Sequence, residues 1–342
     1  MKITMQNKKI EQTIYAIAAG DSLGMPTEDM TPTTISRKFG QVDQLIDTYR
    51  DGSDGSQKKM LAGEVTDDTE NTVFICEALY KCSGDITPEF LVKQMNDWLS
   101  FGSNSKYVVG PSTLNALKKI NAGTPIEQAG IHGATNGCAM KIAPVGVVTD
   151  YKDIKGLVDR VEQVCMPTHN TSVGIAGASI IAAAVSFSFR NKLDNDAAIA
   201  SFFSVLHQTY TEAVKRGNDV PTTNMWLKIE MAINAAQKIK TDGDYWQYLY
   251  DVVGTGLPIV ETVPAVVGIA MRLKFNTWDC IVAAANIGGD TDTLGAIVGA
   301  ICAPQNFNLS ESVVKKINES NPDIDFRLAI EQLNAVLVGE KI

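Results

Sequence analysis

The sequence contains few of the features that mark nucleic-acid-binding proteins, zinc proteins and disulfide-rich proteins. Basic residues are outnumbered, with 30 Lys and Arg against 39 Asp and Glu and a formal net charge of -9 at pH 7. They form no arm or stripe, and binding to a phosphate backbone needs concentrated positive charge, so nucleic acid is a poor candidate partner. The chain has only three His, and its six Cys form no C-x-x-C pair, which argues against zinc and favours reduced, mostly buried thiols.

Long apolar runs are also scarce. The run from Ile175 to Phe187 is short and rich in Ala, and the run from Ile281 to Ala303 is interrupted by two aspartates. Neither offers the roughly 20 uninterrupted apolar residues that a membrane-spanning helix needs. The segment from Met1 to Glu11 is polar and lacks the apolar stretch of a secretory signal. We therefore expect no membrane association and a cytoplasmic location.

The apolar residues that are present recur mainly at helical spacing, and few runs alternate as half-buried strands do. Apolar residues make up 45% of the 342 positions, enough for a sizeable core, and no stretch is long enough to link two domains. We expect an all-α protein, a single compact multi-helix domain over residues 1–342. Helices are predicted around residues 73–80 and 90–99 and over 114–120, 154–164, 173–189, 197–214, 225–239, 245–253, 263–273, 278–286, 293–302 and 326–338.

Turn-forming residues dominate the segment from Arg50 to Lys59. It contains Asp51-Gly52-Ser53-Asp54-Gly55 but lacks the glutamate that completes an EF-hand calcium loop. We expect a mobile surface loop that flanks the functional site.

Two short clusters of carboxylates and hydroxyls lie beside runs of small apolar residues. One is Thr66-Asp67-Asp68-Thr69, and the other is Asp290-Thr291-Asp292-Thr293, which follows Gly288-Gly289. Charge in such surroundings is costly without a nearby counter-charge, and Mg²⁺ is a cation that prefers oxygen ligands. Either cluster alone is equally well explained by acids that cap a helix. Together, the two clusters provide what a metal centre needs when it is assembled from opposite ends of a chain.

Three further segments carry polar residues that have both a structural and a functional explanation. Glu28, after Gly20-Asp21-Ser22-Leu23-Gly24, is either a solvated residue beyond a helix end or a third carboxylate that acts as general acid and base. The loop from Gly133 to Lys141 is either a tight turn or a set of backbone N–H groups that bind an anion. His169 lies in a turn that we expect to open the following helix, where an isolated His is more often structural.

Taken in chain order, these segments resemble the signatures of the ADP-ribosylglycohydrolase family. They occur in the right order over about residues 14–303, which is more specific than any single motif. The matching blocks are Gly20-Asp21-Ser22-Leu23-Gly24 with Glu28, Thr66-Asp67-Asp68-Thr69, Asn136-Gly137-Cys138-Ala139-Met140-Lys141, Thr168-His169 and Gly288-Gly289-Asp290-Thr291-Asp292-Thr293. The resemblance implies an all-α fold with two Mg²⁺ ions in a central cleft, and Mn²⁺ could replace Mg²⁺.

The resemblance also implies a set of metal ligands. One ion would be held at the first acidic cluster and the second at the other, with Asp292 bridging the two. The implied ligands are Thr66, Asp67, Asp68, Asp290, Asp292 and Thr293.

Catalytic and substrate-binding roles follow from the same resemblance. Glu28 would activate water or handle the proton of the leaving group, together with Asp68 and Asp292 as catalytic carboxylates. Asn136 and Gly137 would cradle the distal ribose or the diphosphate. His169 would contact the ribose or an adjacent phosphate.

The activity implied is Mg²⁺-dependent hydrolysis of the N- or O-glycosidic bond at the anomeric ribose carbon of an ADP-ribosylated protein. Two departures stand out: Lys141 replaces an Arg that many members carry, and Ala134 and Thr135 offer no ring where some members have an aromatic. A smaller ribosyl metabolite, such as a nucleoside, is therefore an alternative substrate. A Mg²⁺-dependent phosphohydrolase and a non-enzymatic binding or structural relative are further alternatives, although no implied metal ligand is lost. We expect a monomer.

Overall fold

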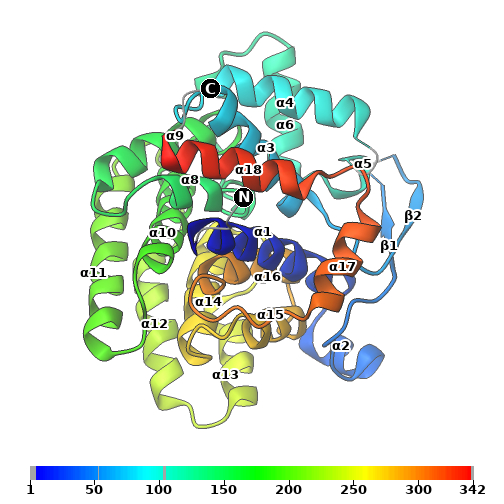
Figure 1. Cartoon of the computed structure of the whole chain (residues 1–342), viewed down its shortest axis with the longest axis vertical. Helices are drawn as coiled ribbons and strands as arrows, with labels where there is room; N and C mark the ends of the chain where they lie inside the picture. The colour runs from blue at the N-terminus through cyan, green and yellow to red at the C-terminus, as the bar shows by residue number, and fades with distance from the viewer. Residues whose placement is uncertain (1–4, 53, 103–104, 340–342) are drawn as a thin grey trace.

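A computed structural model describes residues 5–52, 54–102 and 105–339 of the chain. This part is mostly helical, which confirms the predicted fold class (Figure 1). Its helices are α1 (Met5–Gly24), the 3₁₀ turn η1 (Met25–Thr27), α2 (Pro32–Phe39), α3 (Asp67–Lys81), α4 (Pro88–Phe101), α5 (Ser105–Val108), α6 (Pro111–Asn121), α7 (Ile126–Ala129), the 3₁₀ turn η2 (Asn136–Cys138), α8 (Ala143–Val148), α9 (Ile154–His169), α10 (Ser172–Arg190), α11 (Asp196–Ala213), α12 (Met225–Lys238), α13 (Asp242–Tyr248), the π-helix η3 (Leu249–Val253), α14 (Ile259–Arg272), α15 (Thr277–Asn286), α16 (Thr291–Cys302), α17 (Glu311–Ser320) and α18 (Phe326–Val338).

The exception to the helical pattern is an antiparallel hairpin at the edge of the molecule, formed by β1 (Thr48–Asp51) and β2 (Gln57–Met60) (Figure 1). Thr48 pairs with Met60 and Asp51 with Gln57, over four residue pairs. The expected loop from Arg50 to Lys59 is therefore wrong in its secondary structure, although Ser53 within it lies outside the described residues. Each strand is only four residues long and Met60 alone is fully buried, so the alternation is too short to be read from the sequence.

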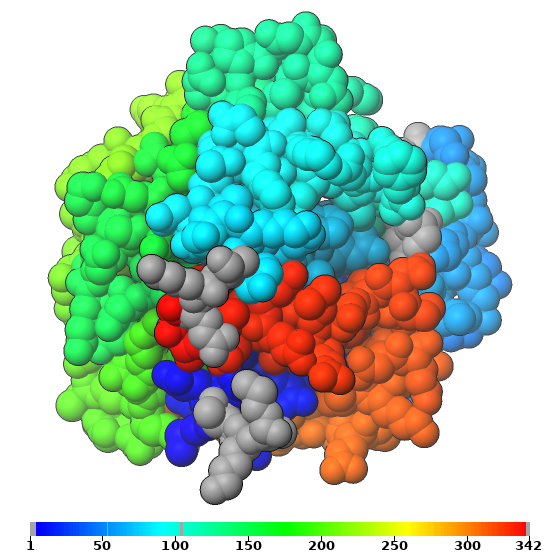
Figure 2. Space-filling model, turned by 45° about the horizontal axis from the view of Figure 1, so that its top comes forward, coloured from blue at the N-terminus to red at the C-terminus, as the bar shows by residue number. Residues whose placement is uncertain are grey.

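The contact between α1 and α16 lies at the centre of the molecule, and it depends on glycine. A Cβ at Gly20 would overlap the backbone of Gly295, and a Cβ at Gly24 would overlap the backbone of Thr291. The two backbones touch because glycine stands on α1 at both points, and on α16 as well at Gly295. The end of α1 and the beginning of α16 are thereby held together, and α18 packs beside α1, so that both ends of the chain meet on one face (Figure 2).

Helix α10 is long and apolar enough to cross a membrane by length and composition alone. It is instead packed among α8, α9, α11, α14 and α16, and 94% of its apolar window is buried inside the protein. This agrees with the interpretation of the Ala-rich run as a tightly packed core helix.

Some helix boundaries differ from the prediction. Helix α9 continues through Pro167 to His169, so His169 ends one helix and does not open the next, which Thr171 caps. Helices α2 and α17 were not predicted, because each is short and Ile35 and Ile317 are their only fully buried residues.

Candidate metal centre

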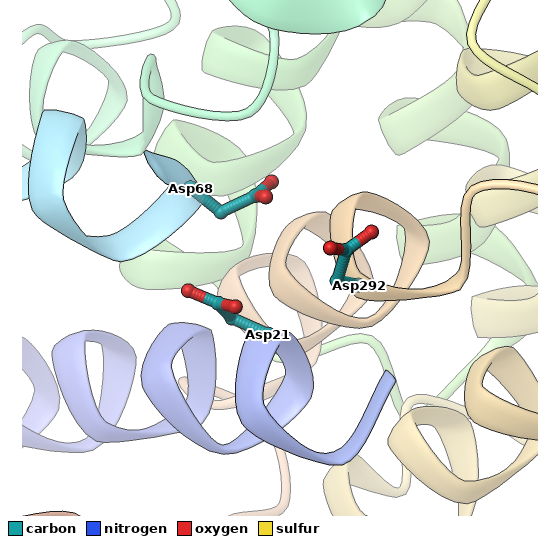
Figure 3. A group of neighbouring side chains, drawn as sticks. All are labelled: Asp21, Asp68 and Asp292. Carbon is teal, nitrogen blue, oxygen red and sulfur yellow. The ribbon is translucent and has the colours of Figure 1, made fainter. Parts of the chain in front are cut away.

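Carboxylates from three distant segments gather where α1, α3 and α16 meet. We call this set the acid cluster: Asp21, Glu28, Asp67, Asp68, Asp290 and Asp292. One oxygen from each of Asp21, Asp68 and Asp292 lies within 4.8 Å of the others (Figure 3), and the same is true of Glu28, Asp290 and Asp292. Asp292 belongs to both groups, which is the position predicted for a bridging ligand.

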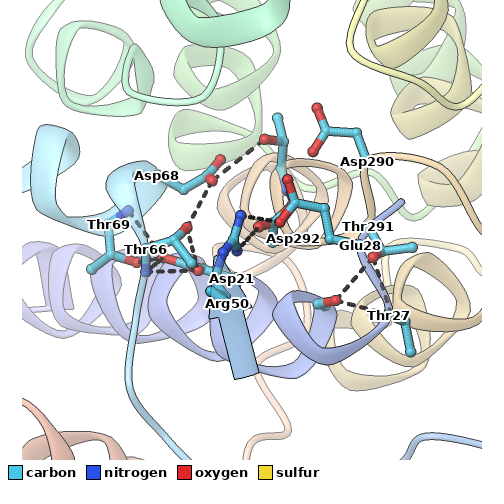
Figure 4. Close-up of polar contacts among 12 residues, drawn as sticks. Asp21, Thr27, Glu28, Arg50, Thr66, Asp68, Thr69, Asp290, Thr291 and Asp292 are labelled. Atoms are coloured by element: carbon cyan, nitrogen blue, oxygen red, sulfur yellow. Dashed lines mark hydrogen bonds and ion pairs between the residues drawn. The ribbon is translucent and has the colours of Figure 1, made fainter. Parts of the chain in front are cut away.

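Capping hydrogen bonds do not explain the acids at the starts of α3 and α16. Thr66 is the N-cap of α3 and Asp290 is the N-cap of α16, yet neither makes a side-chain capping hydrogen bond. Asp21 of α1 performs that task for α3: it accepts the backbone N–H and Oγ1 of Thr66 at 3.0 and 2.8 Å and those of Thr69 at 3.1 and 2.5 Å (Figure 4). Two of the N–H groups at the start of α3 are thus satisfied from another helix, which leaves the carboxylates of its first turn available for a ligand.

The two glycines before the second acidic cluster make the turn that presents it. Gly288 and Gly289 have φ of 83° and 84°, a region that side-chain-bearing residues rarely adopt. Gly289 donates to the Met30 carbonyl at 3.0 Å, and Asp290 N–H donates to the Thr255 carbonyl at 2.9 Å. A Cβ at Gly289 would overlap the Thr255 carbonyl, so only glycine lets the chain pass here on its way to α16.

Arg50, which we did not predict as a site residue, reaches into the acid cluster from β1. Its guanidinium forms an ion pair with Glu28 and donates through Nη1 to Oδ2 of Asp292 at 3.2 Å (Figure 4). Burial raises the pKa of Asp292, but the Arg50 charge and further hydrogen bonds outweigh it and lower that pKa overall. The polar turn-rich sequence around Arg50 gave no signal that this side chain points inward.

The other carboxylates are strongly perturbed. Burial, followed by the charge of Asp292, raises the pKa of Asp67 to about 8 and that of Asp21 to about 6, and the same two causes raise the pKa of Glu28, Asp68 and Asp290. Acids held this close cannot all ionise without a cation.

The donor set fits a divalent cation. Oδ1 of Asp68 is buried and has no hydrogen-bond partner among the described residues, as expected of a ligand atom. Its Oδ2 accepts hydrogen bonds from the hydroxyls of Thr66 at 3.2 Å and Thr293 at 3.4 Å. Asp67, Asp290 and Asp292 line the same cleft, so all six predicted ligands lie at this centre, and their oxygens are of the kind that Mg²⁺ and Mn²⁺ accept.

The loop of Asn136 and Gly137 lies against the acid cluster. Asn136 donates to Oδ2 of Asp290 at 2.6 Å, so it orients a predicted metal ligand, a role that we did not predict. His169 is fully buried beneath Gly137, and its ring nitrogens lie 2.8 Å from Thr135 Oγ1 and 2.7 Å from Thr168 Oγ1. This geometry supports the loop, and the direct contact of His169 with substrate stays a prediction.

Lys141 lies behind this loop. It is fully buried, its Nζ has no partner among the described residues, and burial lowers its pKa. Burial and the nearby Lys141 together lower the pKa of His169 to about 3, which keeps the imidazole neutral.

A cleft of about 270 Å³ opens over the acid cluster. Its lining includes the segment from Tyr107 to Thr113, the loop of Thr135, Asn136 and Gly137, and Leu257. Tyr107 is the single aromatic residue among the described residues of the lining. It supplies a ring that Ala134 and Thr135 lack, from a segment that we did not consider.

Known proteins resemble this chain over nearly its whole length. The family model described as ADP-ribosylglycohydrolase matches residues 2–306. The uncharacterized protein YegU of Escherichia coli (strain K12) is 29% identical over 324 residues, which cover 94% of this chain and 95% of YegU. ADP-ribosylarginine hydrolase Tri1 of Pseudomonas putida (strain GB-1) is 24% identical over 297 residues, 83% of this chain and 69% of Tri1. A solved structure, an ADP-ribosylglycohydrolase-related protein complex, has the same fold with a TM-score of 0.66 and 16% identity, covering 98% of this chain and 99% of that one.

Proposed function

We propose a function for this chain from its membership of the ADP-ribosylglycohydrolase family. It is a Mg²⁺-dependent hydrolase that cleaves the N- or O-glycosidic bond at the anomeric ribose carbon of an ADP-ribosylated substrate. The observation that carries this proposal is the acid cluster at the floor of the cleft, with its two groups of carboxylates joined at Asp292. A buried set of this size is costly to the fold unless it serves a bound cation.

Two ions, Mg²⁺ or Mn²⁺, would be held by the carboxylates of Asp67, Asp68, Asp290 and Asp292 together with the hydroxyls of Thr66 and Thr293. When bound there, they supply positive charge that orients the ribose hydroxyls and a water molecule and favours the ionised form of that water. Asp21 keeps Thr66 in place through its hydrogen bonds, and Asn136 keeps Asp290 in place.

Glu28 is suited to proton transfer. It lines the cleft with 24% of its side chain exposed, so it can reach both substrate and solvent. Burial and the charge of Asp292 raise its pKa, which favours the protonated form that can give its proton to the leaving group. The ionised form could instead take a proton from the attacking water.

The name of the Tri1 relative supports an ADP-ribosylated arginine as the first substrate to test. A second candidate, a smaller ribosyl compound such as a nucleoside, is favoured by the size of the cleft. Its volume of about 270 Å³ is below the roughly 300–1,000 Å³ that ligand pockets usually have.

The test is release of ADP-ribose from ADP-ribosylarginine, and of ribose from a panel of nucleosides, with Mg²⁺ and with EDTA. We expect one substrate class to be cleaved only with Mg²⁺, and we expect Asp292→Asn to lose about 100-fold or more in rate. Asp97→Asn is the control, because Asp97 is an exposed residue of α4 that pairs with Lys93. Full activity of Asp292→Asn would show that the proposed centre is not the catalytic one.

A further inference from the structure

Arg50 contacts carboxylate oxygens that would otherwise be available to bind a metal ion. Its guanidinium pairs with Glu28 and with Oδ2 of Asp292, and its side chain is only 16% exposed. Those two acids form one of the two carboxylate groups, together with Asp290. A guanidinium and a divalent cation repel each other at such spacing, so the two compete for the same carboxylates.

The hairpin that carries Arg50 is anchored to the core by Met60, which is fully buried, whereas the other residues of its strands are exposed or only partly buried and two of its ion pairs are largely exposed. Lys59 pairs with Asp47 at 2.6 Å and Lys106 with Asp54 at 2.8 Å, and about half of each of these side chains is exposed. Exposed ion pairs contribute little stability, and a two-stranded hairpin has little of its own. Arg50 can therefore leave the acid cluster without disturbing the helical core.

The cleft also has little positive charge with which to bind an anionic substrate. Among the described residues that line it, Arg50 is the only Lys or Arg, and the acids are Glu28, Asp29, Asp67, Asp68, Asp290 and Asp292. The diphosphate of an ADP-ribosyl group would be repelled by these acids. A planar guanidinium can hold two phosphate oxygens at once, which no other residue of the described lining can do.

We propose that Arg50 exchanges between the acid cluster and the phosphate of the substrate. Without metal, it neutralises Glu28 and Asp292. When a cation binds to those carboxylates, Arg50 is released and binds the diphosphate. This inference rests on the proposed function, because it takes a divalent cation and a phosphate-bearing ligand as the two partners. The exchange of Arg50 makes the cation and the phosphate-bearing ligand bind cooperatively, since each favours the released position of Arg50.

The test is a calorimetric titration of the EDTA-stripped, dialysed full chain with Mn²⁺, followed by titration with ADP-ribose in the presence and absence of Mn²⁺. The variants are Arg50→Gln and Arg50→Lys, with Arg37→Gln as control, because Arg37 is exposed on α2 and does not line the cleft. We expect Arg50→Gln to bind Mn²⁺ roughly tenfold more tightly than the wild type and to bind ADP-ribose roughly tenfold more weakly with Mn²⁺ present. Arg50→Lys keeps its charge, so it should retain the wild-type Mn²⁺ affinity and still bind ADP-ribose weakly, because it lacks the planar fork.

Each outcome decides a different claim. If the wild type binds Mn²⁺ and Arg50→Gln binds it equally or less tightly, the exchange proposed for Arg50 is wrong while the metal centre stands. If the wild type binds no Mn²⁺, the proposed function fails and the exchange with it. A circular-dichroism melt of each variant in EDTA shows whether the helical fold is kept.

Discussion

At the scale of single residues, the acid cluster divides into acids that hold the structure and acids that remain available to a ligand. Asp21 is fully buried and accepts hydrogen bonds from two threonines, whereas Asp67 is half-buried and lines the cleft. Asp68 lies between these extremes, with one oxygen bonded and the other free of partners among the described residues. Aspartates that lie close together in space therefore have different effects on the stability of the fold.

Asp21→Asn should destabilise the protein by about 2 kcal/mol, because an amide N–H₂ would face the N–H groups of Thr66 and Thr69 and leave one of them unpaired. Urea denaturation at pH 7 in EDTA measures this loss. An unchanged free energy of unfolding would contradict the anchoring role of Asp21.

Asp67→Asn should have the opposite effect in EDTA. The folded-state pKa of Asp67 is about 8, above that of an unfolded Asp, so its contribution to stability is present at low pH and is lost as pH rises from about 4 to 8. Removing the charge should make the variant more stable than the wild type by about 1 kcal/mol at pH 9, with no difference near pH 4. This figure is well below the free energy that corresponds to the whole pKa shift, because a partly exposed carboxylate is screened by solvent.

Urea denaturation at pH 4, 7 and 9 measures the dependence, and adding Mg²⁺ at pH 9 should reverse the order of the two proteins. A variant that is less stable by the same amount at every pH would mean that Asp67 acts through contacts and not through charge.

The residues that sequence reasoning missed are of two kinds. Asp67, Asp68 and Asp292 were identified because acids beside small apolar residues need an explanation. Asp21 carries the same signal and was quoted without a role, so it could have been found. Arg50 and Tyr107 could not, because charged and aromatic residues in polar segments usually lie at the surface, and only the path of the chain brings these two to the cleft.

At the scale of elements, the site depends on how closely α1 approaches α16. Glycines at the crossing allow contact between the two backbones, and this contact sets the position of Asp21 relative to Asp292. Helices such as α12 were predictable because their apolar residues recur on one face, and α10 because it is apolar along its whole length. The hairpin and the amphipathic helices α2 and α17 were not, because each is short and buries very little.

Gly20→Ala should cost about 2 kcal/mol of stability and weaken Mn²⁺ binding, because the new methyl group would force α1 away from the Gly295 backbone. Gly243→Ala is the matched control: Gly243 lies in helix α13 with no atom within 4 Å of an added Cβ, so the change should be neutral or slightly stabilising. Thermal denaturation and Mn²⁺ titration of both variants give the comparison. Equal effects of the two substitutions would show that the helix crossing does not position the acids.

At the scale of the whole molecule, the candidate centre joins the two ends of the fold. Its acids come from residues 21–68 and 290–292, so the centre forms only when α1, α3 and α16 are all in place. Cation binding should therefore stabilise the fold as a unit, since the unfolded chain has no preformed site. The two acidic clusters, at residues 66–69 and 290–293, made this long-range contact predictable from the sequence. The arrangement of their side chains could be seen only in the structure.

The central claim is that the acid cluster is a binuclear cation site, and calorimetric titration of the EDTA-stripped, dialysed chain with Mn²⁺ tests it most directly. Asp292 is shared by both carboxylate groups, so Asp292→Asn is the informative variant. The account predicts two ions bound per wild-type chain and a loss of affinity at both sites, by about tenfold or more, in Asp292→Asn. A wild-type chain that binds no divalent cation, or an Asp292→Asn variant that binds two ions as tightly as the wild type, would contradict it.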